Sequence, residues 1–189
     1  MRTLLTAACL ALALLAPAAS AVADDYTETA DLFRNAGESG EFFKKSYGYA
    51  VFPTIGKAGI GIGGAHGKGR VFVGGKPVGN TKMTQLSVGF QLGAQGYSLM
   101  LFFEDKRAFD EFTTGQFEFG AQASAVVITA AASAGASTSG ASAGASGGKK
   151  DAATAGQYYK GVAPFVIIKG GAMYEASVAG AKFSYEPIK

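Results

Sequence analysis

The chain has 189 residues, of which 48% are hydrophobic and 12% aromatic, with 28 glycines, no tryptophan and a net charge of +3. This composition is typical of one packed globular domain. The only cysteine, Cys9, excludes a disulfide-stabilised scaffold and lies too close to the start of the chain to be the modified cysteine of a lipoprotein. The net charge is too small to predict a partner by itself.

The N-terminal segment has the pattern of a secretory signal peptide. An apolar run at 4–16 follows a basic residue, and small residues before Ala21 and Ala23 give two candidate cleavage sites. The apolar run is too short to span a bilayer. We predict a signal peptide at 1–23, with cleavage after Ala23 favoured, and a single exported domain at 24–189. The mature protein should be periplasmic or secreted, and we also consider peripheral association with a membrane.

Helical spacing predicts a helix over 26–36 and one or two further turns over 41–46. In the second segment two aromatic residues, Phe42 and Phe43, stand beside two lysines. Two interpretations remain open. The aromatics could dock on the core of the domain, or they could insert into the acyl boundary of a membrane while the lysines contact headgroups.

Charge is distributed unevenly along the chain. The charged residues of 24–41 are acidic apart from one arginine, whereas the charged residues of 42–103 are all basic. Such a block creates a positive field that favours an anionic partner. Its cations are Lys44, Lys45, Lys57, Lys68, Arg70, Lys76 and Lys82.

Glycine alternates with isoleucine in the middle of this basic block. Period-two strand geometry would place Ile60 and Ile62 on one packed face and leave the opposite face bare. The bare face consists of Gly59, Gly61 and Gly63. A bare strand face marks a sheet corner or the close approach of another backbone or a ligand. We expect a neighbouring backbone there, so that Gly61→Val would overpack the core. We also expect a turn at 64–69 and a returning strand at 70–73, which together make a glycine-rich hairpin.

Further strands follow. Alternation over 84–96 predicts a strand whose apolar face is buried, and the apolar run at 97–103 predicts a strand covered on both sides. The buried face of the first would carry Leu86, Val88, Phe90, Leu92 and Ala94. Asp105 can cap a helix over 105–114 that ends at Gly115.

The C-terminal half begins with a long alternating strand at 117–127. Residues 130–156 are almost entirely Ala, Ser, Gly and Thr, which favours a mobile loop, although their first part could continue the preceding strand. Three strands joined by glycine turns should close the chain as a meander. They are expected at 162–169, 172–178 and 182–185.

Three ordered blocks of sequence carry a resemblance to a known family. They are Tyr49–Pro53 followed by Lys57–Gly64 and Gly67–Gly69, then Ser87–Gln95, and last Tyr158–Gly161 with Lys169–Ala176 and Gly180. Together they resemble the SYLF lipid-binding family, which includes yeast actin-patch proteins and bacterial secreted proteins. The resemblance covers about residues 30–186. It implies phospholipid binding without enzymatic chemistry, and it does not identify the residues that contact lipid.

Other site signals are weak. The glycines at 59–64 satisfy the dinucleotide fingerprint formally, but a strand rather than a helix is expected after them. His66 is the single histidine, which excludes a His-rich metal site, and it is expected to be exposed in a glycine turn. The acidic residues at 104–111 are explained by a capped, solvated helix. We predict no enzymatic activity, no cofactor, no metal and no nucleic-acid partner.

These observations predict an α+β domain dominated by antiparallel strands. Its sheet would be strongly coiled or a small barrel-like sandwich, with an N-terminal helix and one helix near 105–114. The predicted function is binding of anionic phospholipid at a membrane surface through the cations of residues 42–103 together with Phe42 and Phe43. The alternative is an integral outer-membrane barrel of eight strands, or a structural envelope protein.

Overall fold

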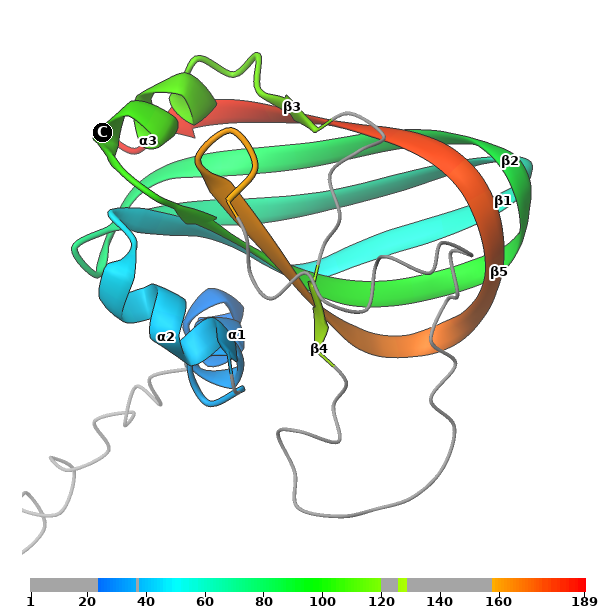
Figure 1. Ribbon diagram of the computed structural model, residues 1–189, viewed down its shortest axis with the longest axis horizontal. Coiled ribbons are helices and arrows are strands. Elements are labelled where there is room, and N and C mark those ends of the chain that lie inside the picture. Colours follow the sequence, from blue (N-terminus) through cyan, green and yellow to red (C-terminus); the bar gives the residue numbers. More distant parts are fainter. Residues whose placement is uncertain (1–23, 37, 120–125, 129–157) are drawn as a thin grey trace, which may run out of the picture.

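The computed structural model describes residues 24–36, 38–119, 126–128 and 158–189. The predicted signal peptide and the low-complexity segment at 130–156 lie outside these described residues. Within them, three helices and five strands form an α+β domain that is mostly antiparallel sheet, as predicted (Figure 1). The helices are α1 (Asp25–Arg34), α2 (Glu38–Lys45) and α3 (Lys106–Thr113). The strands are β1 (Gly48–Val73), β2 (Lys76–Phe103), β3 (Glu118–Phe119), β4 (Val126–Ile128) and β5 (Val162–Pro187).

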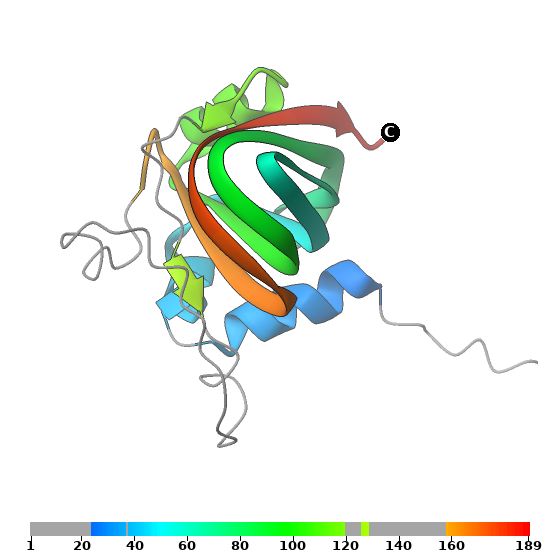
Figure 2. The same cartoon turned by 90° about the vertical axis from the view of Figure 1, so that its right-hand side faces the viewer.

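Three very long strands make the body of the sheet. Strands β1, β2 and β5 have 26, 28 and 26 residues and pair antiparallel in the order β1-β2-β5-β3, while β4 pairs with β5 in parallel. A straight strand of this length would extend about 85 Å. Instead each strand turns back near its middle, at the end of the molecule away from the helices, and Figure 2 shows the three bends as nested arcs. The sheet is strongly curled and is not closed into a barrel. This agrees with the strongly coiled sheet, the first of the two predicted arrangements.

The first hairpin turn lies later than predicted. Strand β1 runs without interruption through 64–69, so the predicted turn there is wrong. The chain reverses at Gly74 and Gly75, whose φ angles of 56° and 77° suit the two-residue turns that join long antiparallel strands. Similarly, 84–96 and 97–103 belong to the single strand β2, and the three predicted C-terminal strands are the single strand β5.

Glycines inside β1 allow its two halves to pack closely. A Cβ atom at Gly67 would lie 2.5 Å from Ile55 Cγ1 and 2.9 Å from the Thr54 carbonyl oxygen. One at Gly69 would lie 2.6 Å from the Phe52 ring. The glycines that resemble a turn in the sequence therefore serve as the contact surface where β1 folds back on itself.

The bend of β1 is centred on Gly61. Its φ of +68° coincides with a register shift between Ile60 and Ile62, and such a positive φ favours glycine. A Cβ atom at Gly61 would meet nothing within 4 Å, so the predicted overpacking by Gly61→Val is wrong. Backbone conformation, rather than a neighbouring backbone, explains this glycine.

The core has two parts on opposite faces of the sheet. Alternate residues of β2 supply both, with Leu101 and Phe103 in one part and Met100 and Phe102 in the other, which confirms that 97–103 is covered on both sides. The first part includes Phe112 from α3. In the second, α1 contributes Ala30 and Phe33, while Phe42 and Phe43 from α2 pack at its margin. The three helices therefore cover the half of the sheet farthest from the bends.

Local signals in the sequence located the helices correctly. Asp105 Oδ1 accepts a hydrogen bond of 2.8 Å from the Ala108 amide, and Gly115 follows the helix with a φ of +74°, which confirms the predicted helix and its cap. The segments predicted at 26–36 and 41–46 correspond to α1 and to an α2 that begins earlier. None of the helices among the described residues is long and apolar enough to cross a membrane.

The strand predicted over 117–127 is wrong. Strands β3 and β4 pair with distant parts of β5, β3 opposite residues 181–182 and β4 opposite 165–167. They also run in opposite directions relative to β5. Strands β3 and β4 are therefore two separate short strands, and residues 120–125 between them lie outside the described part of the chain.

Candidate functional site

A patch of aliphatic side chains is exposed at the bend of the sheet. The exposed fractions are 80% for Ile60, 64% for Ile62, 64% for Leu86, 58% for Val88 and 54% for Leu92. Ile60 lies opposite Leu92 in the β1–β2 register, Ile62 opposite Val88, and Leu86 opposite Gly64, so the residues are neighbours on two adjacent strands. We call these five residues the apolar tip.

The clustering distinguishes the apolar tip from ordinary surface hydrophobics. Single exposed apolar residues are common on soluble proteins, whereas contiguous patches mark interaction sites. Among the residues whose side-chain exposure the structure describes, which leave out 90–91, 126–128 and 172–179, the other large exposed hydrophobics are Leu32, Tyr47 and Ile188, which lie on α1, before β1 and after β5. The concentration of aliphatic residues at the bend therefore requires a functional explanation.

The two faces of the strands near the bend are inverted relative to the prediction. Leu86 and Val88 were predicted to lie on the buried face, but both are exposed, and Ser87 between them is fully buried. Ile60 and Ile62 were likewise predicted to pack and do not. The physical reason for this inversion is that the strands fold back on themselves at the bend. The inner side of the curl is covered by the other half of the sheet, while the outer side at the bend lies beyond the reach of α1 and α2.

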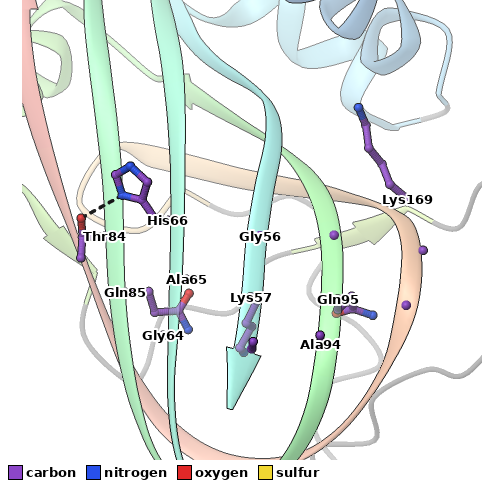
Figure 3. Close-up of a pocket in the computed structure, with 14 residues that line it drawn as sticks. Gly56, Lys57, Gly64, Ala65, His66, Thr84, Gln85, Ala94, Gln95 and Lys169 are labelled. Carbon is purple, nitrogen blue, oxygen red and sulfur yellow. Dashed lines mark hydrogen bonds between the residues drawn. The ribbon is translucent and has the colours of Figure 1, made fainter.

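A groove lies beside the apolar tip, between the two halves of the sheet (Figure 3). It has a volume of about 860 Å³. One wall comes from residues 56–58, 94–96 and 169–171, and the other from 64–66 and 84–85. Most lining residues are glycine or alanine, so the groove is open because few side chains are large enough to fill it. Its edge borders the tip, since the Ala58–Ala94 pair is two residues from the Ile60–Leu92 pair.

The polar side chains of the groove are neutral or basic. Lys57 and Lys169 line the wall that contains the first half of β1, and Lys169 Nζ donates a hydrogen bond of 3.3 Å to Thr54 Oγ1. On the other wall, His66 Nδ1 lies 3.4 Å from Thr84 Oγ1. None of the described residues that line the groove is acidic. The groove therefore combines a mostly small-residue surface with a positive charge.

Two further lysines lie on the exposed face next to the tip. Lys68 and Lys82 are directly opposite each other in the β1–β2 register, and both are exposed. Lys82, Leu86 and Val88 are at even spacing along β2, so strand alternation puts them on the same face. Like charges directly across a pair of strands destabilise a sheet. An anion bound at this face would relieve that repulsion.

The other predicted cations are distributed over distant parts of the domain. Lys44 donates a hydrogen bond of 2.8 Å to Glu41, which lowers the pKa of that carboxyl group. Arg70 is paired with Asp24, and its guanidinium lies 4.3 Å from the centre of the Tyr26 ring. Lys45 ends α2 and Lys76 follows the hairpin turn. Of the predicted cations, Lys57 therefore lies in the groove, and Lys68 and Lys82 lie on the face that carries Leu86, four residues away from the Gly64–Leu86 pair along the strands.

Phe42 and Phe43 pack against other aromatic residues rather than projecting from the surface. The Phe42 ring centre lies 4.9 Å from that of Phe165, and the Phe43 ring centre lies 4.9 Å from that of Phe102. Both side chains are half-buried. The structure thus agrees with the docking interpretation of these two residues, and their part in lipid binding stays a prediction.

Sequence reasoning missed the apolar tip and Lys169. The strand predicted over 84–96 carried no local signal of this arrangement, because the face opposite the leucines consists of glutamines, glycines and a serine, which is an ordinary composition for a solvent-facing side. The alternation was read correctly, but the face directed to the interior was assigned wrongly. Lys169 lies far from the basic block in sequence and reaches the groove only through the pairing of β5 with β2.

Comparison with known proteins gives one family. The family model described as Las17-binding protein actin regulator (Ysc84) matches residues 84–186, which is more than half of the chain. The match begins within β2 and contains Leu86, Val88 and Leu92 of the tip. No curated protein and no solved structure matches the chain. The chain belongs to the SYLF-domain family, which is associated with lipid binding and actin regulation.

Proposed function

We propose that the protein is an exported, non-enzymatic lipid-binding protein that associates with anionic phospholipid at a membrane surface, with its apolar tip inserted among the lipids. The inverted arrangement of β2 at the bend carries this proposal. A strand that buries Ser87 and exposes Leu86 and Val88 places apolar side chains outward at an end of the domain that none of the described helices covers. Removing one such side chain from water contributes about 1.5–3 kcal/mol when burial is complete.

The charges around the tip favour an anionic surface. Lys57, Lys68 and Lys82 belong to a segment without acidic residues, and the Lys68–Lys82 pair lies four residues from the Gly64–Leu86 pair along the strands. A lysine close to an anionic membrane contributes roughly 1 kcal/mol to binding. Apolar insertion and electrostatic attraction therefore act at the same end of the molecule. The predicted signal peptide supports a periplasmic or secreted location, where the protein would meet the outer face of a membrane.

Vesicle cosedimentation tests the proposal. The purified protein should bind vesicles of phosphatidylcholine with phosphatidylglycerol more tightly than vesicles of phosphatidylcholine alone, and the difference should shrink as salt screens the exposed charges. An Ile60→Ser, Leu92→Ser double variant should weaken binding about tenfold or more, because two adjacent side chains no longer leave water on binding. Leu32→Ser, which changes an exposed residue on α1, is the matched control and should bind normally.

A second pair of variants tests the charge contribution. Lys68→Gln together with Lys82→Gln should reduce both the affinity for anionic vesicles and its salt dependence, while Lys76→Gln at the hairpin turn should change neither much. Unaltered vesicle binding by the double tip variant would overturn the assignment of the tip. Equal affinity for neutral and anionic vesicles at low and high salt would overturn the anionic preference.

A further inference from the structure

We infer that the groove beside the apolar tip holds one acyl chain of a single anionic phospholipid, so that the protein binds a lipid molecule one to one as well as a bilayer surface. This inference rests on the proposed function for its class of ligand. It assigns a separate site to that ligand and can therefore fail by itself.

The space in the groove has the character of a binding site. Its volume of about 860 Å³ falls within the range of about 300–1,000 Å³ that ligand sites occupy. Gly56, Gly96 and Gly170 all line it, and a Cβ atom added at any of them would meet nothing within 4 Å. At Gly67, in the part of β1 that packs against its own first half, an added Cβ atom would collide with backbone. The glycines at 56, 96 and 170 therefore leave space in the groove, whereas Gly171 in the same lining packs against the backbone of β2, where an added Cβ would collide with the Ala94 carbonyl oxygen.

The position of the groove suits a lipid that arrives from a membrane. The Ala58–Ala94 pair borders the Ile60–Leu92 pair of the tip, and Gly64 lies opposite Leu86. An acyl chain that leaves a bilayer at the tip would therefore reach the groove along an apolar surface with little exposure to water. The predominance of glycine and alanine in the lining provides an apolar wall without side chains that compete for the space.

The charges of the groove identify the head of the ligand. Lys57 and Lys169 are both in its lining, and Lys169 is held by its hydrogen bond to Thr54. His66, Gln85 and Gln95 add further groups that can donate hydrogen bonds. The two lysines would attract an anionic phosphate through charge-assisted hydrogen bonds. A zwitterionic headgroup would gain less, since its own cation would face the lysines.

Titration with single-chain lipids below their micelle concentration tests the inference. Lysophosphatidylglycerol should bind the protein with saturable one-to-one stoichiometry in calorimetry and native mass spectrometry. Lysophosphatidylcholine of the same chain length should bind more weakly, and glycerol 3-phosphate, which has the anionic head without the chain, should show no measurable binding. Strong binding of glycerol 3-phosphate would instead indicate a phosphate site and overturn the acyl-chain assignment.

Variants connect the binding to the groove. Gly96→Leu should abolish one-to-one binding because the added side chain enters the open space, and Gly56→Leu, directly opposite in the register, serves if the first variant does not fold. Lys57→Gln and Lys169→Gln should each weaken binding of lysophosphatidylglycerol roughly two- to fivefold, while Lys76→Gln should not. Unchanged one-to-one binding by a folded Gly96→Leu or Gly56→Leu protein would overturn the inference, as would the absence of saturable binding by the unaltered protein.

The two sites can be separated by a cross-comparison. The double tip variant should lose vesicle binding and keep one-to-one binding of lysophosphatidylglycerol, and Gly96→Leu should show the reverse. If the unaltered protein bound lysophosphatidylglycerol one to one but did not bind vesicles, the proposed surface function would be contradicted and the inference about the groove would stand. Vesicle binding without any one-to-one binding would contradict only the groove.

Discussion

Two glycines in β1 should respond in opposite directions to the same substitution by alanine. At Gly67 the new methyl group would lie 2.5 Å from Ile55 Cγ1, 2.9 Å from the Thr54 carbonyl oxygen and 3.2 Å from Ile55 Cα. Two of these atoms belong to backbone, which cannot rotate away as the end of a side chain can. Separating the two halves of β1 to relieve the overlap should lower the free energy of unfolding by about 1–3 kcal/mol.

At Gly56 the added methyl group would meet nothing within 4 Å. Alanine would mainly restrict the unfolded chain there, which should raise the free energy of unfolding by about 0.4–1 kcal/mol. The two variants should therefore differ by roughly 1.5–4 kcal/mol, the sum of both effects. Urea or guanidinium denaturation measures the difference, provided that the denaturant dependence of the unfolding free energy stays unchanged. A Gly67→Ala protein as stable as the Gly56→Ala protein would refute the account of β1 folding back on itself.

Other predictions concern α3 and alkaline pH. Asp105→Ala should lower the free energy of unfolding by about 0.5–2 kcal/mol because the Ala108 amide loses its acceptor, whereas Asp105→Asn keeps an acceptor and should retain most of the stability in the same denaturation assay. Burial raises the pKa of Tyr49 and of Tyr158 in the folded protein. The unfolded chain therefore releases these two phenol protons first, at a pH of about 10. The free energy of unfolding should be unaffected by these groups below that pH and should fall as the pH rises above it. Melting temperatures measured on both sides of that pH should fall less for Tyr49→Phe than for the unaltered protein, and an equal fall would contradict the assignment.

The features predicted correctly from sequence depend on local chemistry. Asp105 and Gly115 mark the ends of α3 because capping and a positive φ are properties of a few neighbouring residues. The apolar run that ends at Phe103 was recognised as buried on both faces because no polar residue interrupts most of it. The role of the glycines at 64–69 could not be predicted from neighbouring residues in this way. Glycine has the same signature in a turn and at a close contact, and only the return of β1 brings Phe52 against Gly69.

The candidate site was partly predictable for a similar reason. Alternation separates Ser87 from its neighbours Leu86 and Val88, but it cannot say which face is interior when a strand bends away from the helices that would cover it. The basic block indicated an anionic partner, and strand register then decided which cations meet. Lys68 and Lys82 lie opposite each other because the hairpin turn is at Gly74 and Gly75 rather than at the predicted position. The position of the turn therefore determines which lysines share a face with the apolar tip.

The pairing of β2 with β5 also has a consequence for how the chain reaches its folded state. The register pairs Phe103 with Val162 and Gly79 with Pro187. Nearly the whole edge of β2 that does not pair with β1 therefore stays unpaired until β5, the last strand of the sequence, has formed. The hairpin of β1 and β2 can form early from nearby residues, but contacts between distant segments form slowly. During that interval the hairpin presents a long, unpaired edge that can add strands from other molecules. A chain interrupted before Val162 would keep that edge permanently, which makes aggregation the expected fate of C-terminal truncations.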